Sequence, residues 1–418
     1  MNKRQILQTL GPGILFASTA IGVSHLVQST RAGALAGWGL LWAVALANVA
    51  KYPFFEFGSR YASATGQSLI QGYRQMGRWA AWSFLLLTLL TCFFVLGAVG
   101  LVTAAFLDDL MGISSQTQTQ ATPAVAVAVM LGSAILLMLG AYRGLDRFIK
   151  VLAVVLLLST CVAFFAAAGQ TAPWDVPRPS EDFNPWNGAG LAFLIALVGW
   201  MPSAVDMSTW NSIWTLERIR ETGYRPTLKQ TLREFNLGYW MSALLALFFM
   251  GLGAMILFVK QIELPEGTAA FAAGIVELYT SALGGWSRPF VAASAFSAML
   301  GTIVACLDGY TRSLSASFQT LFEDKDFAKS KWLVLLLAAG SLGLILGFPD
   351  DIRTLVDIAT TLSFLVAPLV AAANWHLVTR SSFPTEARPP HWLMALSGVG
   401  MLFLVGFGLL FLRTLSDL

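Results

Sequence analysis

Two polar interruptions inside long apolar runs hold the side chains that could do chemistry. The first covers residues 22–25 (Gly-Val-Ser-His), and the second covers residues 200–206 (Trp-Met-Pro-Ser-Ala-Val-Asp). His25, Met201 and Asp206 would supply nitrogen, sulfur and oxygen donors, a mixed set that suits a transition metal better than magnesium or calcium. They are our candidate metal ligands. The other candidates for substrate binding lie in or near the same stretches: Gly22, Ser24, Trp200, Ser203 and Trp210.

Each of the three candidate ligands also has a structural interpretation. A His in an apolar run is costly unless it faces a cavity or a partner, so His25 is either a ligand or proton acceptor, or a hydrogen-bonded packing residue. Asp206 either holds a cation or caps the helix that follows Pro202, because the positive end of a helix dipole favours a carboxylate. Met201 taken alone is more often a core residue than a ligand.

Tryptophans around Asp206 support a second hypothesis. Trp200, Trp210 and Trp214 flank the carboxylate in the sequence. Aromatic rings next to a negative charge hold organic ammonium groups through cation–π contacts, although interfacial or packing Trp is the commoner case. A small organic solute therefore stays open, beside a metal, as the substrate.

Four further charged residues lie within apolar runs and are candidates for ion coupling or gating. Lys51 and Glu56, five residues apart, are alternatively expected to form an internal pair or to extend to the membrane interface. Asp308 and Arg312 are spaced i,i+4, so they can pair on one helix face. Asp357, at the start of another run, is expected at the interface.

The elements that position these side chains are transmembrane helices. Hydrophobic residues make up 56% and charged residues 12% of the 418 residues, whereas a soluble domain has about 25% charged residues. Many of the apolar runs have roughly the 20 residues that a helix needs to cross the hydrocarbon layer. We predict an all-α integral membrane protein with about eleven transmembrane helices, at 11–33, 35–57, 80–107, 123–142, 147–169, 188–216, 236–259, 286–315, 331–348, 354–376 and 391–413.

The distribution of basic residues predicts the topology. They concentrate in every second loop, which places the N-terminus in the cytoplasm and the C-terminus outside. We expect the membrane to be a bacterial inner membrane. The basic loops hold Arg60, Arg74 and Arg78; Arg143, Arg147 and Lys150; Arg218, Arg220, Arg225, Lys229 and Arg233; Lys325, Lys329 and Lys331; and Arg380 and Arg388.

The two interruptions fall in the first and sixth predicted helices. Pro202 removes a backbone donor and clashes with the preceding turn, so the sixth helix should break there. Interrupted helices at matching places in two halves indicate an inverted-repeat transporter with its substrate site near the midplane. The repeats would be about residues 11–170 and 188–376 of a single transmembrane domain, 1–418, with an extra helix at about 391–413.

Several segments around these breaks resemble the NRAMP (natural resistance-associated macrophage protein) divalent metal transporters. They are the Gly-Pro-Gly-Ile-Leu of residues 11–15, the Leu-Ala-Asn of residues 46–48, the Tyr-Arg-Gly-Leu-Asp of residues 142–146, and Met201-Pro202. The resemblance covers most of the first six helices. It implies a LeuT-like fold of 5+5 inverted repeats with discontinuous helices 1 and 6, and transport of a divalent metal cation by alternating access.

The sequence departs from this family at its metal-binding motifs. The helix 1 signature Asp-Pro-Gly-Asn is replaced by residues 22–25, and the helix 6 signature Met-Pro-His reads Met201-Pro202-Ser203. The third helix has no acidic residue between 86 and 107, where the family has acids along a proton route. We therefore expect weak or absent proton coupling, and a carrier of a small organic solute or organic cation is the alternative to a metal transporter.

Other classes of function have little support. The sequence has no Walker-type loop or nucleophile elbow, which argues against an ATP-driven pump or an enzyme. We expect no cofactor, because a divalent metal would be cargo, and no nucleic-acid partner, because the net charge of +3 is small and scattered. The expected partners are the lipid bilayer and a small cation or small-molecule substrate, bound by a monomer. Cys92, Cys161 and Cys306 lack metal-site spacing and are expected to be free thiols.

Overall fold

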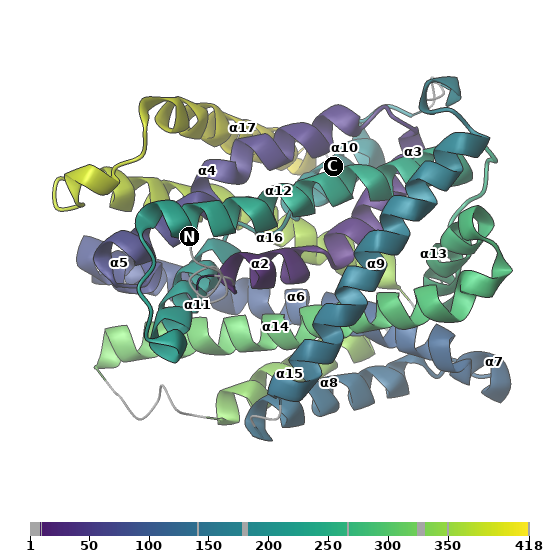
Figure 1. Cartoon of the computed structure of the whole chain (residues 1–418), viewed down its shortest axis with the longest axis horizontal. Helices are drawn as coiled ribbons and strands as arrows, with labels where there is room; N and C mark the ends of the chain where they lie inside the picture. Colours follow the sequence, from purple (N-terminus) through teal and green to yellow (C-terminus); the bar gives the residue numbers. More distant parts are fainter. Residues whose placement is uncertain are drawn as a thin grey trace.

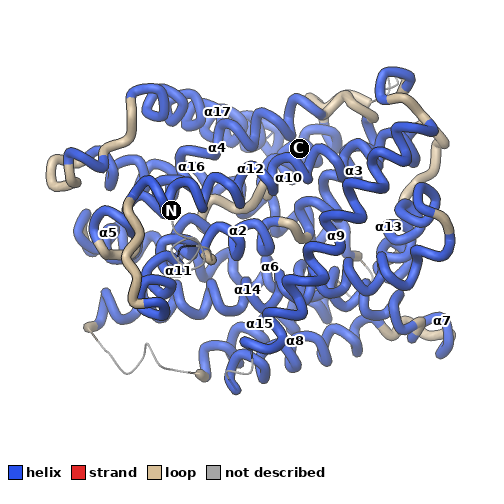
Figure 2. The backbone as a smooth tube through the Cα atoms, in the orientation of Figure 1, coloured by secondary structure: helices blue, strands red, loops and turns tan. Residues whose placement is uncertain are grey.

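The computed structural model is a bundle of helices packed around the first helix (Figure 1). It describes residues 9, 11–139, 142–177, 183–265, 267–323, 331–348 and 351–416. Helices and connecting loops make up this described part of the chain, which contains no strand (Figure 2). The helices are α2 (Pro12–Ala20), η1 (Ser24–Ser29), α3 (Thr30–Ala36), α4 (Leu41–Thr65), α5 (Leu69–Met76), α6 (Arg78–Met111), α7 (Ile113–Thr117), α8 (Thr122–Leu139), α9 (Tyr142–Gln170), η2 (Pro173–Asp175), α10 (Gly188–Gly199), α11 (Met207–Thr222), α12 (Leu228–Leu252), η3 (Gly253–Phe258), α13 (Thr268–Leu283), η4 (Gly285–Ser287), α14 (Arg288–Phe322), α15 (Trp332–Gly347), α16 (Ile352–Thr379), η6 (Thr385–Ala387) and α17 (His391–Ser416).

The predicted all-α fold with interrupted helices 1 and 6 is confirmed. Helix 1 consists of α2, η1 and α3, and helix 6 consists of α10 and α11. The helix predicted at 286–315 continues to Phe322. The short α-helices α5, α7 and α13 were not predicted, because none of them is an apolar run of membrane-spanning length. Of the basic residues that predicted the topology, Lys325 and Lys329 lie outside the described residues.

The surface of the bundle is suited to lipid. Six helices of the described chain are each long and apolar enough to span a bilayer, and further apolar helices are shorter or interrupted. Large apolar side chains point outward from several of them, with 52 to 76% of their surface exposed: Leu86, Leu90, Phe165, Leu402 and Leu409. An outward apolar surface of this kind indicates a membrane environment.

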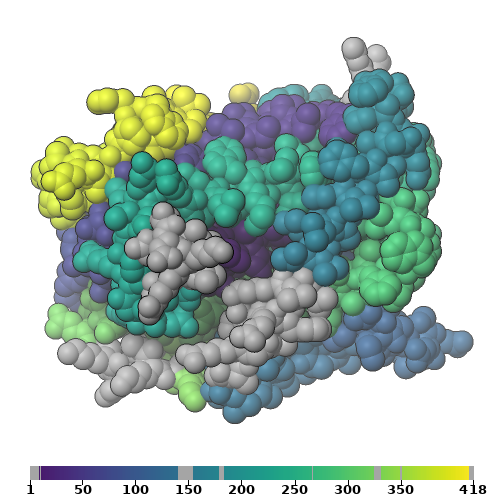
Figure 3. Space-filling model, viewed as in Figure 1, coloured from purple at the N-terminus to yellow at the C-terminus, as the bar shows by residue number. Residues whose placement is uncertain are grey.

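Helix 1 is held along its length by α12. Two close crossings require glycine: a Cβ on Gly13 would lie 2.5 Å from the carbonyl oxygen of Glu234, and a Cβ on Gly33 would overlap the carbonyl oxygen of Met250. The Glu234 carboxylate also accepts hydrogen bonds from the backbone N–H groups of Gly11 and Gly13, at 2.8 to 2.9 Å. It therefore satisfies donors that the start of α2 leaves free. In Figure 3 only a small area of the dark purple helix 1 is visible, beside the teal of α12.

A buried ion pair joins α4 to the connection between α16 and α17. The Arg60 guanidinium donates to both carboxylate oxygens of Glu56, at 2.6 and 2.8 Å, and to the carbonyl oxygen of Ala387 at 2.7 Å. The side chains are only 7% and 3% exposed. The internal pair predicted between Lys51 and Glu56 is therefore wrong, because Arg60, one turn away on the same helix, takes the Glu56 carboxylate.

Candidate functional site

The break in helix 1 is a short non-helical step followed by a π-helix. The α2 helix ends at Ala20, residues 21 and 22 bend, and η1 begins at Ser24. A Cβ on Gly22 would lie 2.8 Å from the Thr302 hydroxyl oxygen of α14, so glycine permits this close approach. Where helix hydrogen bonds are lost, backbone groups are left free to bind other partners.

The break in helix 6 is longer. The α10 helix ends at Gly199, residues 200–206 do not form a helix, and α11 begins at Met207. Pro202 lies in the middle of this segment, as predicted from its missing N–H. The two breaks touch, because the Ser24 hydroxyl donates to the carbonyl oxygen of Pro202 at 3.2 Å.

Lys51 of α4 donates hydrogen bonds to three carbonyl groups at the helix 6 break. Its ammonium nitrogen lies 2.6 Å from the carbonyl oxygen of Val198, 2.8 Å from that of Gly199 and 3.2 Å from that of Ser203. The Lys51 side chain is fully buried. Its charge also interacts with that of Asp206 at the far end of the break.

A small cavity lies between the two breaks and α14. Its volume is about 30 Å³, which is room for one or two groups of the size of water. Among the described residues that line it, Asp206 is the one that carries a charge. Five of the predicted substrate-binding residues line this cavity together: Ser24, Trp200, Ser203, Asp206 and Trp210.

The other predicted residues lie beside the cavity but do not line it. The His25 ring is fully buried and faces α12. Its Nδ1 lies 2.7 Å from the Ser24 hydroxyl, and its Nε2 lies 2.8 Å from the carbonyl oxygen of Ser242. Met201 is also fully buried, with its sulfur 3.9 Å from the Ser29 hydroxyl. Gly22 is packed against Thr302. The structure therefore does not bring His25, Met201 and Asp206 together around one point.

Of the cavity residues that were not predicted from the sequence, three have side chains that bear on the chemistry of the site. Met207 follows Asp206, and its sulfur lies 3.1 Å from the Ser203 hydroxyl. Cys306 and Tyr310 come from α14, and the Tyr310 hydroxyl interacts with the Asp206 carboxyl group. Cys306 and Tyr310 flank Asp308 in the sequence, so this acid inside an apolar run was a signal that α14 faces the site. Within the described residues, no three His, Cys, Asp or Glu side chains gather as a metal-binding group.

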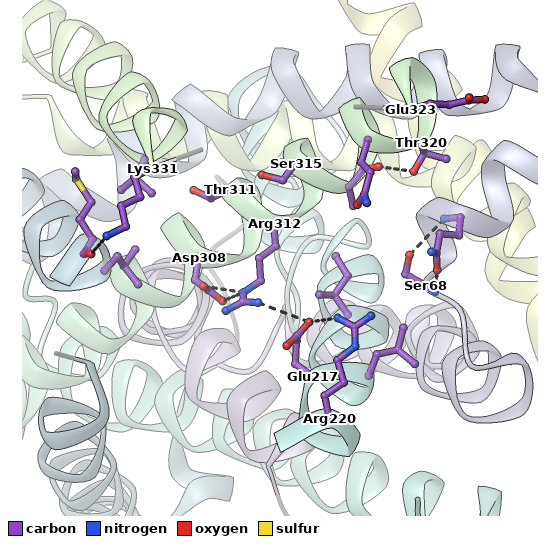
Figure 4. A pocket seen from close by; sticks show the side chains of 18 residues that line it. Ser68, Glu217, Arg220, Asp308, Thr311, Arg312, Ser315, Thr320, Glu323 and Lys331 are labelled. Atoms are coloured by element: carbon purple, nitrogen blue, oxygen red, sulfur yellow. Dashed lines mark hydrogen bonds and ion pairs between the residues drawn. The ribbon is translucent and has the colours of Figure 1, made fainter. Parts of the chain in front are cut away.

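A larger cavity, the α14 vestibule, opens on the side of the basic loops. It has a volume of about 680 Å³, and its lining includes Ser68, Glu217, Arg220, Asp308, Arg312 and Lys331. The predicted pairing of Asp308 with Arg312 is confirmed at 2.8 Å, and Arg312 also reaches Glu217 of α11 at 4.0 Å (Figure 4).

Aromatic side chains separate this vestibule from the small cavity. Trp210 lines the small cavity, and its ring lies 6.1 Å from the ring of Trp214. The indole N–H of Trp214 lies 3.4 Å from the Asp308 carboxylate. An unbroken series of contacts thus leads from the small cavity to the ion pairs of the α14 vestibule.

A second vestibule, the α3 vestibule, lies toward the opposite ends of the helices. Its volume is about 450 Å³ and its lining includes Arg31, Leu35, Phe258 and Arg353. Arg31 makes a two-point contact with the Asp357 carboxylate, at 2.7 and 3.1 Å, and Gln28 donates to the same carboxylate. Asp357, at the start of its apolar run, was expected at the interface, and this ion pair between α3 and α16 was not predicted.

Two interrupted helices around a small cavity, inside a bundle with a lipid-facing surface, define an integral membrane transporter. The sequence model of the Nramp family, described as natural resistance-associated macrophage protein-like, matches residues 13–414. The chain belongs to this family, as its resemblance predicted. Membership in a transporter family also argues against an enzymatic activity.

The chain is also similar to one curated relative and to several solved structures. An uncharacterized protein of Pasteurella multocida (strain Pm70), PM0681, is 33% identical over 406 residues, which cover 96% of this chain and 91% of the relative. The structure of a manganese transporter from Eremococcus coleocola superposes with a TM-score of 0.71 at 15% identity, covering 99% of this chain and 87% of that one. Mhp1, a nucleobase-cation-symport-1 family transporter with bromovinylhydantoin bound, gives a TM-score of 0.64 at 16% identity, with 97% and 92% covered. These likenesses confirm the LeuT-like fold.

Proposed function

We propose that this chain is a secondary transporter that moves a divalent metal cation by alternating access. The observation that carries the proposal is the placement of Asp206, the charged side chain on an ion-sized cavity between two interrupted helices. Met207 and Cys306 add sulfur atoms to the lining, and sulfur ligands favour transition metals. Ser24 and Ser203 add hydroxyl oxygens. The manganese transporter of the same fold supports this class of cargo.

The arrangement of the vestibules supports alternating access. The α14 vestibule lies on the side of the basic loops, which we propose to be the cytoplasmic side of a bacterial inner membrane. The Asp308–Arg312–Glu217 contacts would close the cavity toward that side, and the Arg31–Asp357 pair would close it toward the other. Because α6 has no acid between residues 86 and 107, we propose that proton coupling is weak or absent.

An organic cation is the second candidate, because Trp200 and Trp210 line the cavity beside Asp206. The volume of about 30 Å³ favours the metal in this conformation. A metal ion fits such a space, whereas an organic ammonium ion would require the helices to move apart.

Replacing Asp206 with Asn is expected to weaken metal binding at least about tenfold, because it removes the charge that faces the cavity. Isothermal titration of the purified protein with Mn²⁺ and Cd²⁺ would measure this change. Asp351→Asn is the matched control: Asp351 is exposed and caps α16 by accepting from the N–H of Thr354 at 3.0 Å, and Asn caps a helix equally well. Equal metal affinity in Asp206→Asn and wild type would rule out the proposed role of Asp206. Absence of binding to any transition metal, with heat released by an organic cation, would favour the second candidate.

The native thiol of Cys306 is expected to report opening of the cavity. In a Cys92→Ser/Cys161→Ser background, Asp308→Asn should speed labelling of Cys306 by a membrane-impermeant thiol reagent added on the side of the basic loops. The reason is that the substitution removes the charge that holds Arg312 over the α14 vestibule. Arg220→Gln is the control, because Arg220 is 72% exposed and pairs with Glu217 in the same vestibule. Labelling at the wild-type rate in Asp308→Asn would show that these contacts do not close the path.

A further inference from the structure

The hydrogen bonds of Lys51 match the shape of a protonated amine. An ammonium group has three N–H donors and no acceptor, and three carbonyl oxygens lie within 3.2 Å of the Lys51 nitrogen. Val198 and Gly199 close α10, whose last carbonyl groups have no partner within the helix and form the negative end of its dipole. The break in helix 6 is thus built around a cation that the chain itself supplies.

This ammonium group also changes the charge of the small cavity. Asp206 lies at the other end of the same seven-residue break, and the two charges attract each other. The neighbouring charges on α4 cancel separately, because Glu56 pairs with Arg60. Lys51 and Asp206 therefore give the site a net charge near zero. The negative charge that a metal ion would meet at Asp206 is thus already compensated by the Lys51 ammonium group. The carbonyl oxygens of the break already accept hydrogen bonds from the same group.

We propose that Lys51 is a specificity-determining residue, a tethered cation that holds the carbonyl oxygens of the helix 6 break and weakens the binding of any free cation beside Asp206. This inference concerns the same site as the proposed function and rests on its location there. The physical basis is repulsion between like charges in a site of low dielectric constant, which discriminates against highly charged cargo. Removing the charge of Lys51 should then increase the affinity for divalent cations.

The test is the affinity of purified Lys51→Met for Mn²⁺ and Cd²⁺, measured by isothermal titration beside wild type. We expect binding at least about tenfold tighter than in wild type, a change of about 1.4 kcal/mol. Lys51→Arg keeps the charge and should bind as wild type does. Lys331→Met is the matched control, because Lys331 also donates to a backbone carbonyl, that of Met138 at 2.9 Å, but lies in the α14 vestibule. It should leave the affinity unchanged.

A second variant keeps the test possible if Lys51→Met does not fold. Lys51→Gln removes the charge but keeps an amide that can donate to two of the three carbonyl groups, so it should also bind divalent cations more tightly. Equal or weaker binding in a folded Lys51→Met or Lys51→Gln protein would overturn the inference. If wild type binds no metal and the variant does, the inference stands and the proposed metal cargo fails. If wild type binds metal and the variants do so no better, the cargo stands and the inference fails.

Discussion

Arg60→Ala is expected to lower the free energy of unfolding by about 3–5 kcal/mol, since removing one partner of a buried ion pair leaves an uncompensated charge. The Glu56 side chain is only 3% exposed in the wild-type protein. In the variant its carboxylate would stay buried and would lose two hydrogen bonds from the guanidinium. The carbonyl oxygen of Ala387 would lose its donor as well. Reversible unfolding of the protein in detergent or bicelles would measure the change.

Two comparisons separate this effect from a general loss of charge. Arg220→Ala removes an arginine that is 72% exposed and paired with Glu217, and it should change the stability by at most about 1 kcal/mol. The double variant Glu56→Leu/Arg60→Met should recover most of the loss, because apolar side chains of similar volume need no buried partner. A double variant as unstable as Arg60→Ala would show that the cost arises elsewhere.

Gly33→Ala should destabilise the protein by about 3 kcal/mol, at the upper end of the usual cost of overpacking. The added methyl group would overlap the carbonyl oxygen of Met250 and lie 2.8 Å from the amide nitrogen of Ala254. These are backbone atoms of α12 and η3, so α3 would have to move away from both elements. The loss should appear as a lower Tm of the purified protein in detergent.

Gly343→Ala provides the matched control for this change. Gly343 lies within α15, and no atom lies within 4 Å of the position that its Cβ would take. The substitution there should raise stability by about 0.5–1 kcal/mol, because Ala has the higher helix propensity. Similar Tm values for both variants would mean that the helix 1–α12 crossing can relax at little cost.

The fold could be predicted because its determinants are local. Runs of about 20 apolar residues specify membrane helices without regard to their partners, and Pro202 breaks a helix wherever that helix packs. Helix α13 escaped prediction for the same reason, because its 16 residues fall short of a span. The arrangement of these helices as 5+5 inverted repeats was predicted from the resemblance to the family.

The site was predicted only in part, because helices 1 and 6 depart locally from α-helical geometry. These departures change which side chains lie on the same face. The π-helix of η1 forms i→i+5 hydrogen bonds in place of i→i+4, which alters the direction of the side chains along it, and His25 turns toward α12. The seven residues of the helix 6 break follow no helical period. Met201 within the break is buried without lining the cavity, whereas Met207, the first residue of α11, lines it. The partners of Lys51 lie 147 to 152 positions away in the chain, a distance at which sequence spacing carries no information.

The contacts between α12 and helix 1 limit how the two parts of helix 1 can move relative to each other. Glu234 holds the start of α2, Ser242 holds His25 at the break, and the Gly33 crossing holds α3. A swing of α2 alone about residues 21–22 would strip Glu234 of its backbone donors and leave a buried carboxylate without partners, which is costly. Sliding helix 1 and α12 together avoids that loss. In the alternating access that we propose, helix 1 and α12 are therefore expected to move together as one unit, without bending at residues 21–22.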